Sequence, residues 1–322
     1  MIRIAIIGLG LIGASLGMAL RNADPKESPL GVVEVIGFDR EPRVIREARG
    51  RLAIDREART LAEAVREAQM VVVATPVRAM REVFRELAAL LPAGVVVTDV
   101  ASTKAQVCQW AAELLPRTVS FVGGHPMAGR EKAGPAAADP DLFREAIYGL
   151  TATGDTAPPA IEAVEALVRA VGAKPYYIDP EEHDAYVAGI SHLPLLLSVG
   201  LVTATGTSPA WKEMAPLAAT GFRDVSRLAS GDPQMQRDIL LTNPHGLTRW
   251  IDELIRFLVT VREQINAGDV AAIEQILQQA KATRDAWLES KPHLRPGEAD
   301  FTAMPTVERP SLLGFRLPKR EQ

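Results

Sequence analysis

His125 is the residue whose type and setting most directly indicate chemistry in this chain. It stands in the run Gly-Gly-His-Pro-Met-Ala-Gly at 123–129. The ordinary pKa of histidine lies near neutral pH, so its side chain can take a proton from a reacting group. The alternative is a loop histidine whose ring nitrogens are satisfied by neighbours. His125 is therefore a candidate general base.

A glycine motif near the start of the chain has the pattern G-x-G-x-x-G and comprises Gly8, Leu9, Gly10, Leu11, Ile12 and Gly13. It follows an expected strand and opens an expected helix, which is the setting that makes this pattern informative. The first glycine would allow a tight turn, the second a close approach of pyrophosphate, and the third the packing of helix on strand. We therefore expect a dinucleotide site here, with a glycine-rich turn that binds nothing as the alternative.

Asp39 ends the second expected strand, where a carboxylate can accept hydrogen bonds from an adenosine ribose. The same carboxylate would repel the extra phosphate of NADP, so NAD is the expected cofactor. Arg40 leaves NADP open, because an arginine beside the ribose can bind that phosphate. Thr75 and Pro76 follow a later strand and are expected to border the cofactor.

Ser102 follows an expected strand at 95–99, as His125 follows one at 119–123. The carboxyl ends of parallel strands are where ligands bind in open sheets. We expect the Ser102 hydroxyl to orient the imidazole of His125. The alternative is that Ser102 caps a helix that starts at Thr103. His183 is expected only to take part in the start of a helix, without a catalytic role.

Alternating strands and helices fill the first half of the chain and predict a parallel sheet with helices on both faces. After Asp179-Pro180, a helix cap followed by a first-turn proline, only helices are expected. The predicted fold is α/β, a Rossmann-type doubly wound sheet followed by an all-α dimerisation domain. Its parts are a dinucleotide-binding domain at 1–179, a helical substrate and dimerisation domain at 180–291, and a proline-rich tail at 292–322.

Composition and charge indicate a soluble globular protein of the cytoplasm. The formal charge of −4 gives no basic surface for nucleic acid, and a single cysteine, Cys108, is typical of a reducing cytoplasm. The first residues predict a strand and no signal peptide. The apolar segment 187–204 approaches the length of a membrane span, but its polar residues favour a helix buried in a soluble core. No membrane, nucleic-acid or metal partner is expected.

The chain resembles the prephenate and arogenate dehydrogenases from its first strand to about residue 290. The residues that carry the resemblance occur in the family's order: the 123–129 run with Glu131, Ser191-His192-Leu193-Pro194, and Gly221-Phe222-Arg223-Asp224. The resemblance implies NAD-dependent oxidative decarboxylation of prephenate to 4-hydroxyphenylpyruvate, on the route to tyrosine. Arogenate, or both substrates, remains the alternative.

The resemblance also implies roles for single residues. His125 would take the proton of the substrate ring hydroxyl, and Ser102 would position His125. Arg223 would hold a substrate carboxylate, with an ion pair to Asp224 as the alternative. His192 and Ser191 would line the substrate site, although a lone histidine on an apolar helix is more often a core residue. Glu131 would gate the site or pair with a cation, with a solvated loop acid as the alternative.

Two departures from the family weaken the prediction of the substrate. Leu195 stands where many relatives have a second histidine that contacts the polar side of the substrate. Gln236 stands where a tryptophan is frequent. The other readings are a nucleotide-sensing regulator without turnover and an unrelated hydroxyacid dehydrogenase. The apolar helices with Trp211 and Trp250 predict a homodimer, with a self-contained bundle as the alternative.

Overall fold

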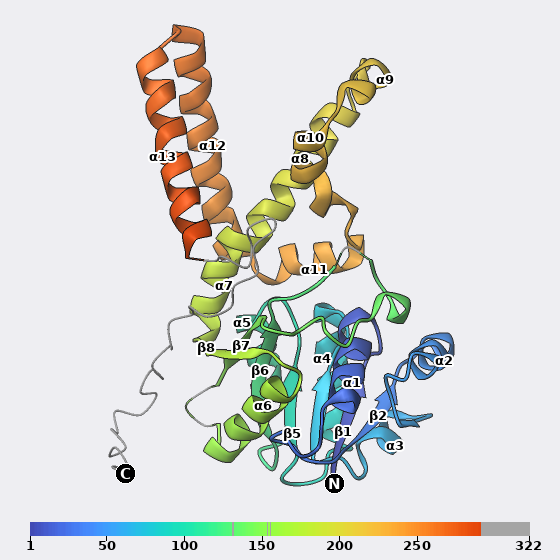
Figure 1. Ribbon diagram of the computed structural model, residues 1–322. Coiled ribbons are helices and arrows are strands. Elements are labelled where there is room, and N and C mark those ends of the chain that lie inside the picture. The colour runs from blue at the N-terminus through green and yellow to red at the C-terminus, as the bar shows by residue number, and fades with distance from the viewer. Residues whose placement is uncertain (131, 153, 155, 291–322) are drawn as a thin grey trace. The chain divides into compact units, whose positions relative to one another are not determined.

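An eight-stranded sheet lies at the centre of the first half of the chain, as Figure 1 shows for the computed structural model. The structure describes residues 1–290 except 131, 153 and 155. The strand order is β3-β2-β1-β4-β5-β6-β7-β8. The strands are β1 Ile2–Ile7, β2 Val33–Phe38, β3 Arg56–Glu57, β4 Met70–Val73, β5 Val96–Asp99, β6 Ser120–Pro126, β7 Ile147–Thr151 and β8 Lys174–Tyr177.

All neighbouring strands pair in parallel except β6 and β7, which are antiparallel. The predicted parallel sheet is confirmed except at this pair. A parallel pair needs a crossover connection that is usually a helix. Between β6 and β7 the described residues form one short 3₁₀ turn, Pro135–Ala137, and no α-helix. The chain therefore returns beside β6 in the opposite direction.

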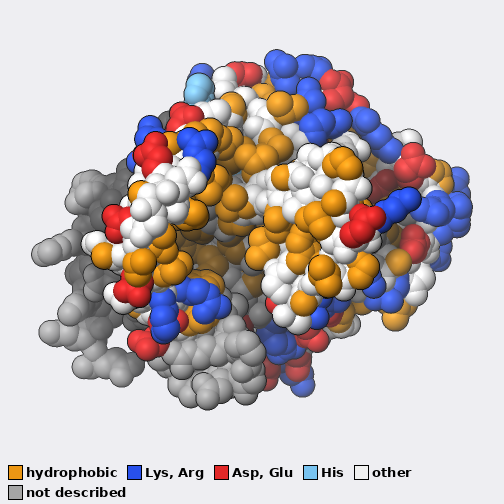
Figure 2. All heavy atoms as spheres, turned by 90° about the horizontal axis from the view of Figure 1, so that it is seen from above, with side chains coloured by type: hydrophobic (Ala, Val, Ile, Leu, Met, Phe, Trp, Pro, Cys, Tyr) orange, Lys and Arg blue, Asp and Glu red, His pale blue; other side chains and the backbone are white. Residues whose placement is uncertain are grey.

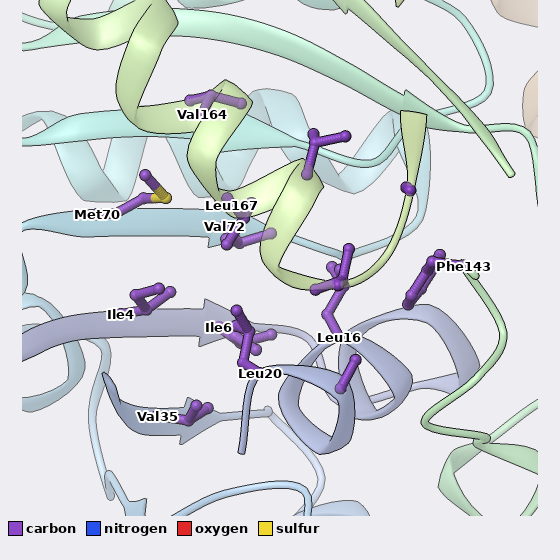
Figure 3. Packing of buried hydrophobic residues seen from close by; sticks show 14 of the residues in the cluster. Ile4, Ile6, Leu16, Leu20, Val35, Met70, Val72, Phe143, Val164 and Leu167 are labelled. Carbon is purple, nitrogen blue, oxygen red and sulfur yellow. The ribbon is translucent and has the colours of Figure 1, made fainter. Parts of the chain in front are cut away.

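Helices cover both faces of the sheet because the strand side chains alternate between two apolar cores. Ile4 and Ile6 of β1 face one core with α1 and α6, while Ala5 and Ile7 face the other with α3, α4 and α5. Figure 3 shows the first core, where Leu16 of α1 and Leu167 of α6 lie over the strands. Burial of each large aliphatic side chain contributes about 1.5–3 kcal/mol. The helices are α1 Leu11–Asn22, α2 Pro42–Gly50, α3 Leu61–Val65, α4 Val77–Ala88, α5 Ala105–Leu114 and α6 Pro158–Ala170.

Only helices follow β8 in the described part of the chain, as expected. Asp179 caps the first of them, since its carboxylate accepts hydrogen bonds from the amides of Glu181 and Glu182. A π-helical segment, Ala188–His192, separates α7 from α8. The helices are α7 Pro180–Val187, α8 Leu193–Gly206, α9 Trp211–Met214, α10 Thr220–Ser226, α11 Pro233–Thr242, α12 Pro244–Ala267 and α13 Val270–Glu289.

The chain forms two compact units that divide between Leu247 and Thr248. The first holds the sheet and the helices through α11, and the second holds most of α12 together with α13. The change from sheet to helices at 179 thus lies inside the first unit, and the predicted domain boundary there stays a prediction. The predicted tail at 292–322 lies outside the described residues.

The long apolar helix from Pro180 to Gly206 is largely uncovered. It has the length and composition of a membrane span, and only 28% of its most apolar 18-residue window is buried by the rest of the chain. Within α8 the buried residues are Leu195 and Ser198. The expectation that this segment is buried in the core is therefore wrong for one chain by itself. Its apolar surface needs another partner.

Candidate active site

His125 lies inside β6, one residue before its end, and pairs across to Gly149 of β7. We expected it to follow a strand that ended at residue 123. The strand runs further because the antiparallel partner β7 continues to bond the backbone there. Only 7% of His125 is exposed. Its imidazole is therefore held by the sheet and by neighbouring side chains, and is not a loop side chain in water.

A chain of two histidines and one carboxylate runs from His125 into α7. The Nδ1 atom of His125 lies 2.8 Å from Nε2 of His183, and Nδ1 of His183 lies 2.8 Å from Oδ1 of Asp184. The two rings meet edge to face, with centroids 5.0 Å apart. The prediction that His183 serves only the start of a helix is wrong. Its place in the first turn of α7 aims the ring at His125.

Asp184 determines which atoms donate and which accept in the hydrogen bonds from His125 to His183 and from His183 to Asp184. Its carboxylate also accepts hydrogen bonds from the backbone amides of Lys104 and Ala105, at 2.7 and 3.0 Å, where α5 begins. An oxygen of this carboxylate that accepts from the backbone amides presents lone pairs to His183 as well. Nδ1 of His183 must then carry the proton and its Nε2 must accept. Nδ1 of His125 donates to that atom, which leaves the Nε2 lone pair of His125 free for a substrate proton.

Burial keeps His125 in the unprotonated form. Burial lowers the pKa of His125 well below its ordinary value, and the neighbouring His183, Lys104 and His192 lower it further. Burial likewise lowers the pKa of His192 to about 4, an effect that Asp184 partly offsets. A base that is already neutral at pH 7 needs no proton removed before it reacts. The site is therefore set for proton abstraction across the neutral range.

The lowered pKa of His125 predicts the acid side of the pH profile. The unprotonated ring is the reactive form, and lowering its pKa keeps that form populated at and below pH 6.5. We expect kcat/KM to stay level as the pH falls from 8 to about 6.5 and to decline only below that. Initial rates in mixed buffers, with activity checked after return to pH 7.5, measure this. An acid limb centred above pH 6.5 would contradict it.

Ser102 does not take the position that we expected. His183 occupies the Nδ1 atom of His125, and among the described residues the Ser102 hydroxyl has no recorded contact with that ring. The Ser102 backbone instead lies by His192, where it partly offsets the lowering of that pKa. Helix α5 starts at Ala105, so Ser102 is not its N-cap either. A role of Ser102 toward a bound substrate stays a prediction.

The predicted substrate residues of the helical half lie in different surroundings. His192 is buried in the π-helical segment, and its Nδ1 lies 3.4 Å from Nδ2 of Asn243, whereas Ser191 beside it is exposed. Arg223 projects from α10 with 73% of its side chain exposed, and its Nε bonds Asp224 at 2.9 Å. Within one chain Arg223 thus has the ion pair that was the alternative. Glu131 lies outside the described residues.

The glycine motif has the geometry that a dinucleotide needs. Gly8 adopts a φ of 97°, which other residues rarely tolerate, and turns the chain from β1 into α1. A Cβ on Gly13 would lie 2.0 Å from the carbonyl oxygen of Gly8, so only glycine lets the helix start this close to the strand. A Cβ on Gly10 would meet no atom of the protein within 4 Å. Helix α1 begins without a side-chain cap, which leaves its first amides for an anion.

Asp39, Arg40 and Thr75 surround this turn. The carboxylate of Asp39 accepts hydrogen bonds from the amides of Leu9 and Glu41, both at 2.9 Å, and so ties β2 to the glycine turn. Arg40 forms an exposed ion pair with Glu86, at 3.1 Å. At the end of β4, Thr75 Oγ1 is buried without a hydrogen-bond partner among the described residues. Pro76 follows it as the residue before α4.

Comparison with known proteins identifies the family of this chain. Residues 18–177 match the family model described as prephenate dehydrogenase, nucleotide-binding domain, and residues 179–279 match prephenate dehydrogenase, dimerization domain. A prephenate dehydrogenase of Bacillus subtilis is 37% identical over 287 residues, which cover 88% of this chain and 75% of that protein. The chain belongs to the prephenate dehydrogenase family.

Solved structures of the family share the fold. A prephenate dehydrogenase from Aquifex aeolicus, in complex with hydroxyphenyl propionate and NAD+, superposes with a TM-score of 0.81 at 28% identity, covering 89% of this chain and 98% of that one. An arogenate dehydrogenase from Synechocystis superposes with a TM-score of 0.73 at 30% identity, covering 89% and 100%. The family thus includes enzymes named for either substrate.

The two departures from the family pattern have different surroundings. Leu195 is buried in the first turn of α8, three residues after His192. Gln236 lies on α11, and its Nε2 donates to the carbonyl of Leu228 at 2.8 Å. Leu195 is therefore a buried apolar residue of α8 at the position where the family resemblance implied a histidine. Gln236 is used within the chain to join two helical segments.

Two glycine variants should separate cofactor binding from folding. Gly10→Ala is expected to leave the melting temperature within about 2 °C of the parent and to weaken NAD binding at least tenfold, because the new methyl meets only the cofactor. Gly13→Ala is the matched control, whose methyl meets the Gly8 carbonyl and should lower the melting temperature itself. Fluorescence titration and thermal unfolding measure both. Unchanged NAD affinity in Gly10→Ala would exclude the turn as the pyrophosphate site.

Proposed function

We propose that this chain catalyses the oxidative decarboxylation of prephenate to 4-hydroxyphenylpyruvate and carbon dioxide, with NAD as the oxidant, in tyrosine biosynthesis. The observation that carries the proposal is the row of hydrogen bonds from Nδ1 of His125 through His183 to Asp184, which leaves the lone pair of His125 on Nε2. The hydrogen bonds through His183 to Asp184 fix that lone pair in one direction. Membership of the prephenate dehydrogenase family supplies the substrate class.

His125 takes the proton of the substrate ring hydroxyl on its Nε2 as the carbon that bears this hydroxyl is oxidised. Loss of the ring carboxylate as carbon dioxide then leaves its electron pair in the ring, which becomes an aromatic phenolate. The phenolate oxygen takes the proton back from His125. The imidazolium that exists between these two steps is stabilised by the ionised Asp184 through His183. The protein thus supplies alignment and a proton carrier, while aromatisation supplies much of the driving force.

The residues at the carboxyl end of the sheet fit NAD. NAD held there would supply the acceptor for the hydride that leaves the hydroxyl-bearing carbon of the substrate. Gly10 leaves space for its pyrophosphate, and the uncapped first turn of α1 offers amides to it. Asp39 has lone pairs left for the adenosine ribose and repels a 2′-phosphate, and Glu86 already pairs with Arg40. Thr75, whose hydroxyl is buried without a hydrogen-bond partner among the described residues, is the residue that we propose to border the cofactor after β4.

Arg223, His192, Ser191 and Glu131 are the residues that we propose for substrate binding, with Ser102 at the hydroxyl. Arg223 would exchange its exposed pair with Asp224 for a substrate carboxylate, which costs little because such pairs contribute only about 0–1 kcal/mol. Leu195 bears on the choice between two substrates. An apolar side chain there gives the substrate side chain less polar contact than a histidine would, so arogenate, which carries an amino acid in place of the pyruvyl group, is kept as the alternative substrate.

The decisive experiment measures initial rates of NADH or NADPH formation with prephenate and with arogenate, each against NAD and NADP. The expected result is turnover of prephenate with NAD. Turnover of arogenate alone would mean that the proposed substrate is wrong in its side chain, the part that Leu195 is expected to affect. No measurable rate with any of the four combinations would favour a nucleotide-sensing regulator or a dehydrogenase that acts on a different hydroxyacid.

We further propose that the chain works as a cytoplasmic homodimer. Large apolar side chains remain exposed on α8, α12 and α13, among them Leu197, Val202, Trp250, Phe257 and Trp287. Figure 2 shows hydrophobic side chains exposed among charged ones in the view from above. A second copy would cover such surface by twofold pairing of helices. The single buried thiol of Cys108 suits a reducing compartment.

Sedimentation of the purified chain at micromolar concentration tests the dimer. The expected mass is about twice the 34.7 kDa of one chain. A monomer under these conditions would contradict the proposal and would leave the exposed apolar helices to a different partner.

A further inference from the structure

Lys104 is a fully buried cation that the proposed reaction does not use. Neither its side chain nor that of Asp99, with which it forms an ion pair, is exposed at all. Its Nζ also donates to the carbonyl oxygen of Gly124 at 2.6 Å. Removing a charged pair from water costs several kcal/mol per ion unless its geometry is excellent. Stability alone is thus a weak explanation for the presence of this buried pair, which points to a second role.

The pair holds the residue that precedes the candidate base. The amide of Gly124 donates to Oδ1 of Asp99 at 3.0 Å, and the carbonyl of Gly124 accepts from Lys104. Asp99 is fixed in turn by the amide of Ala101, which donates to Oδ2 at 2.8 Å. Both polar backbone groups of Gly124 therefore end on the Asp99–Lys104 pair. The backbone position of His125 follows from that anchoring.

The same lysine holds the other end of the histidine chain. Its backbone amide donates to Oδ1 of Asp184, the oxygen that also accepts from His183. Lys104 thus binds β6 through its side chain and α7 through its main chain. The 2.8 Å contact between His125 and His183 spans these two elements. Lys104 thus links the two elements across which the two rings bond.

The positive charge of Lys104 also affects the protonation of His125. The titratable groups around His125 are His183 and Asp184 from α7, His192 from the π-helical segment, Asp99 from β5, and Lys104 itself. Burial has the largest effect on the pKa of His125, and the positive charge of Lys104 lowers it further. A fixed cation within the same buried cluster makes a second positive charge on the imidazole unfavourable.

We propose that Lys104 is a positioning residue that fixes the imidazole of His125 against His183. This inference rests on the proposed role of His125 as the base. Lys104 touches neither substrate nor cofactor, because its ammonium group is enclosed by protein. Its effect passes through the strand end, through Asp184 and through its charge.

The test replaces Lys104 by methionine, which keeps the length and removes the charge. Long-range ¹H–¹⁵N spectra of the histidine rings, with the His125 signal assigned from His125→Asn, report the tautomer and pKa of His125 without any turnover. In Lys104→Met we expect the pKa of His125 to rise by about one unit and its Nδ1-protonated tautomer to become mixed. We also expect kcat to fall about tenfold with the KM for NAD unchanged.

Lys174→Met is the matched control, because Lys174 forms a half-exposed ion pair with Glu145 away from the histidines. It should change neither the His125 signal nor kcat. If Lys104→Met does not fold, Asp99→Asn with Lys104→Met removes the whole pair and is expected to raise the pKa of His125 in the same way. A folded variant of either kind with the parental pKa and tautomer of His125 would overturn the proposal. Loss of the base role would appear separately, as full activity in His125→Asn.

Discussion

His125→Asn is expected to lower kcat by about a hundredfold or more while leaving the affinity for NAD nearly unchanged. Asparagine keeps a polar group that can bond His183 in place of Nδ1, so the local structure should survive. It has no group that takes a proton near pH 7, and the substrate hydroxyl would then have to lose its proton to water. The loss should appear in kcat and kcat/KM together, because the missing interaction forms only as the hydroxyl proton moves.

Steady-state kinetics with prephenate and NAD, with NAD binding followed by fluorescence, make this measurement. His245→Asn is a suitable control, because His245 is exposed at the start of α12. It should retain parental kinetics. Undiminished turnover in His125→Asn would remove His125 from the mechanism, and a loss confined to thermal stability would return it to a structural role.

His183→Phe is expected to lower kcat by about tenfold to a hundredfold. Phenylalanine fills the space of the ring but offers no acceptor for Nδ1 of His125 and no donor to Asp184. The imidazole of His125 is then free to carry its proton on Nε2, where it cannot accept one from the substrate. The KM for NAD should not change, because the glycine turn lies on a different part of the sheet.

His183→Gln separates this effect from simple loss of packing. The amide oxygen of glutamine can reach the position of the Nε2 acceptor, so part of the activity should return relative to His183→Phe. Equal activity in the parent and in His183→Phe would mean that another group orients His125. Equal losses in both variants would mean that the ring itself, and not its acceptor, is needed.

Local signals in the sequence predicted the cofactor half of the site. The turn at Gly8 and the close approach at Gly13 depend on residues that are adjacent in the chain, so a short motif is sufficient to specify them. The cap at Asp179 was equally evident from the sequence. The two-residue strand β3 and the five-residue helix α3 were missed, because such short elements carry too little periodicity.

The hydrogen-bonded chain behind His125 could not be read from the sequence in the same way. His183 is 58 residues away from His125, and its position in the first turn of a capped helix has an ordinary structural explanation. The adjacent Asp184 was the one local sign, because a carboxylate beside a histidine can fix its tautomer. The same distance problem led us to give Ser102 the position that His183 holds.

By itself the sequence determined the glycine turn, the alternation of strands and helices, the candidate base and the family, because these depend on residue types at short spacing. Only the tertiary structure decided that β7 runs antiparallel, that His183 and Asp184 orient His125, and that Lys104 joins β6 to α7. The physical reason is that hydrogen bonds and burial act between groups close in space. Which distant residues become close is decided by how the strands and helices pack together.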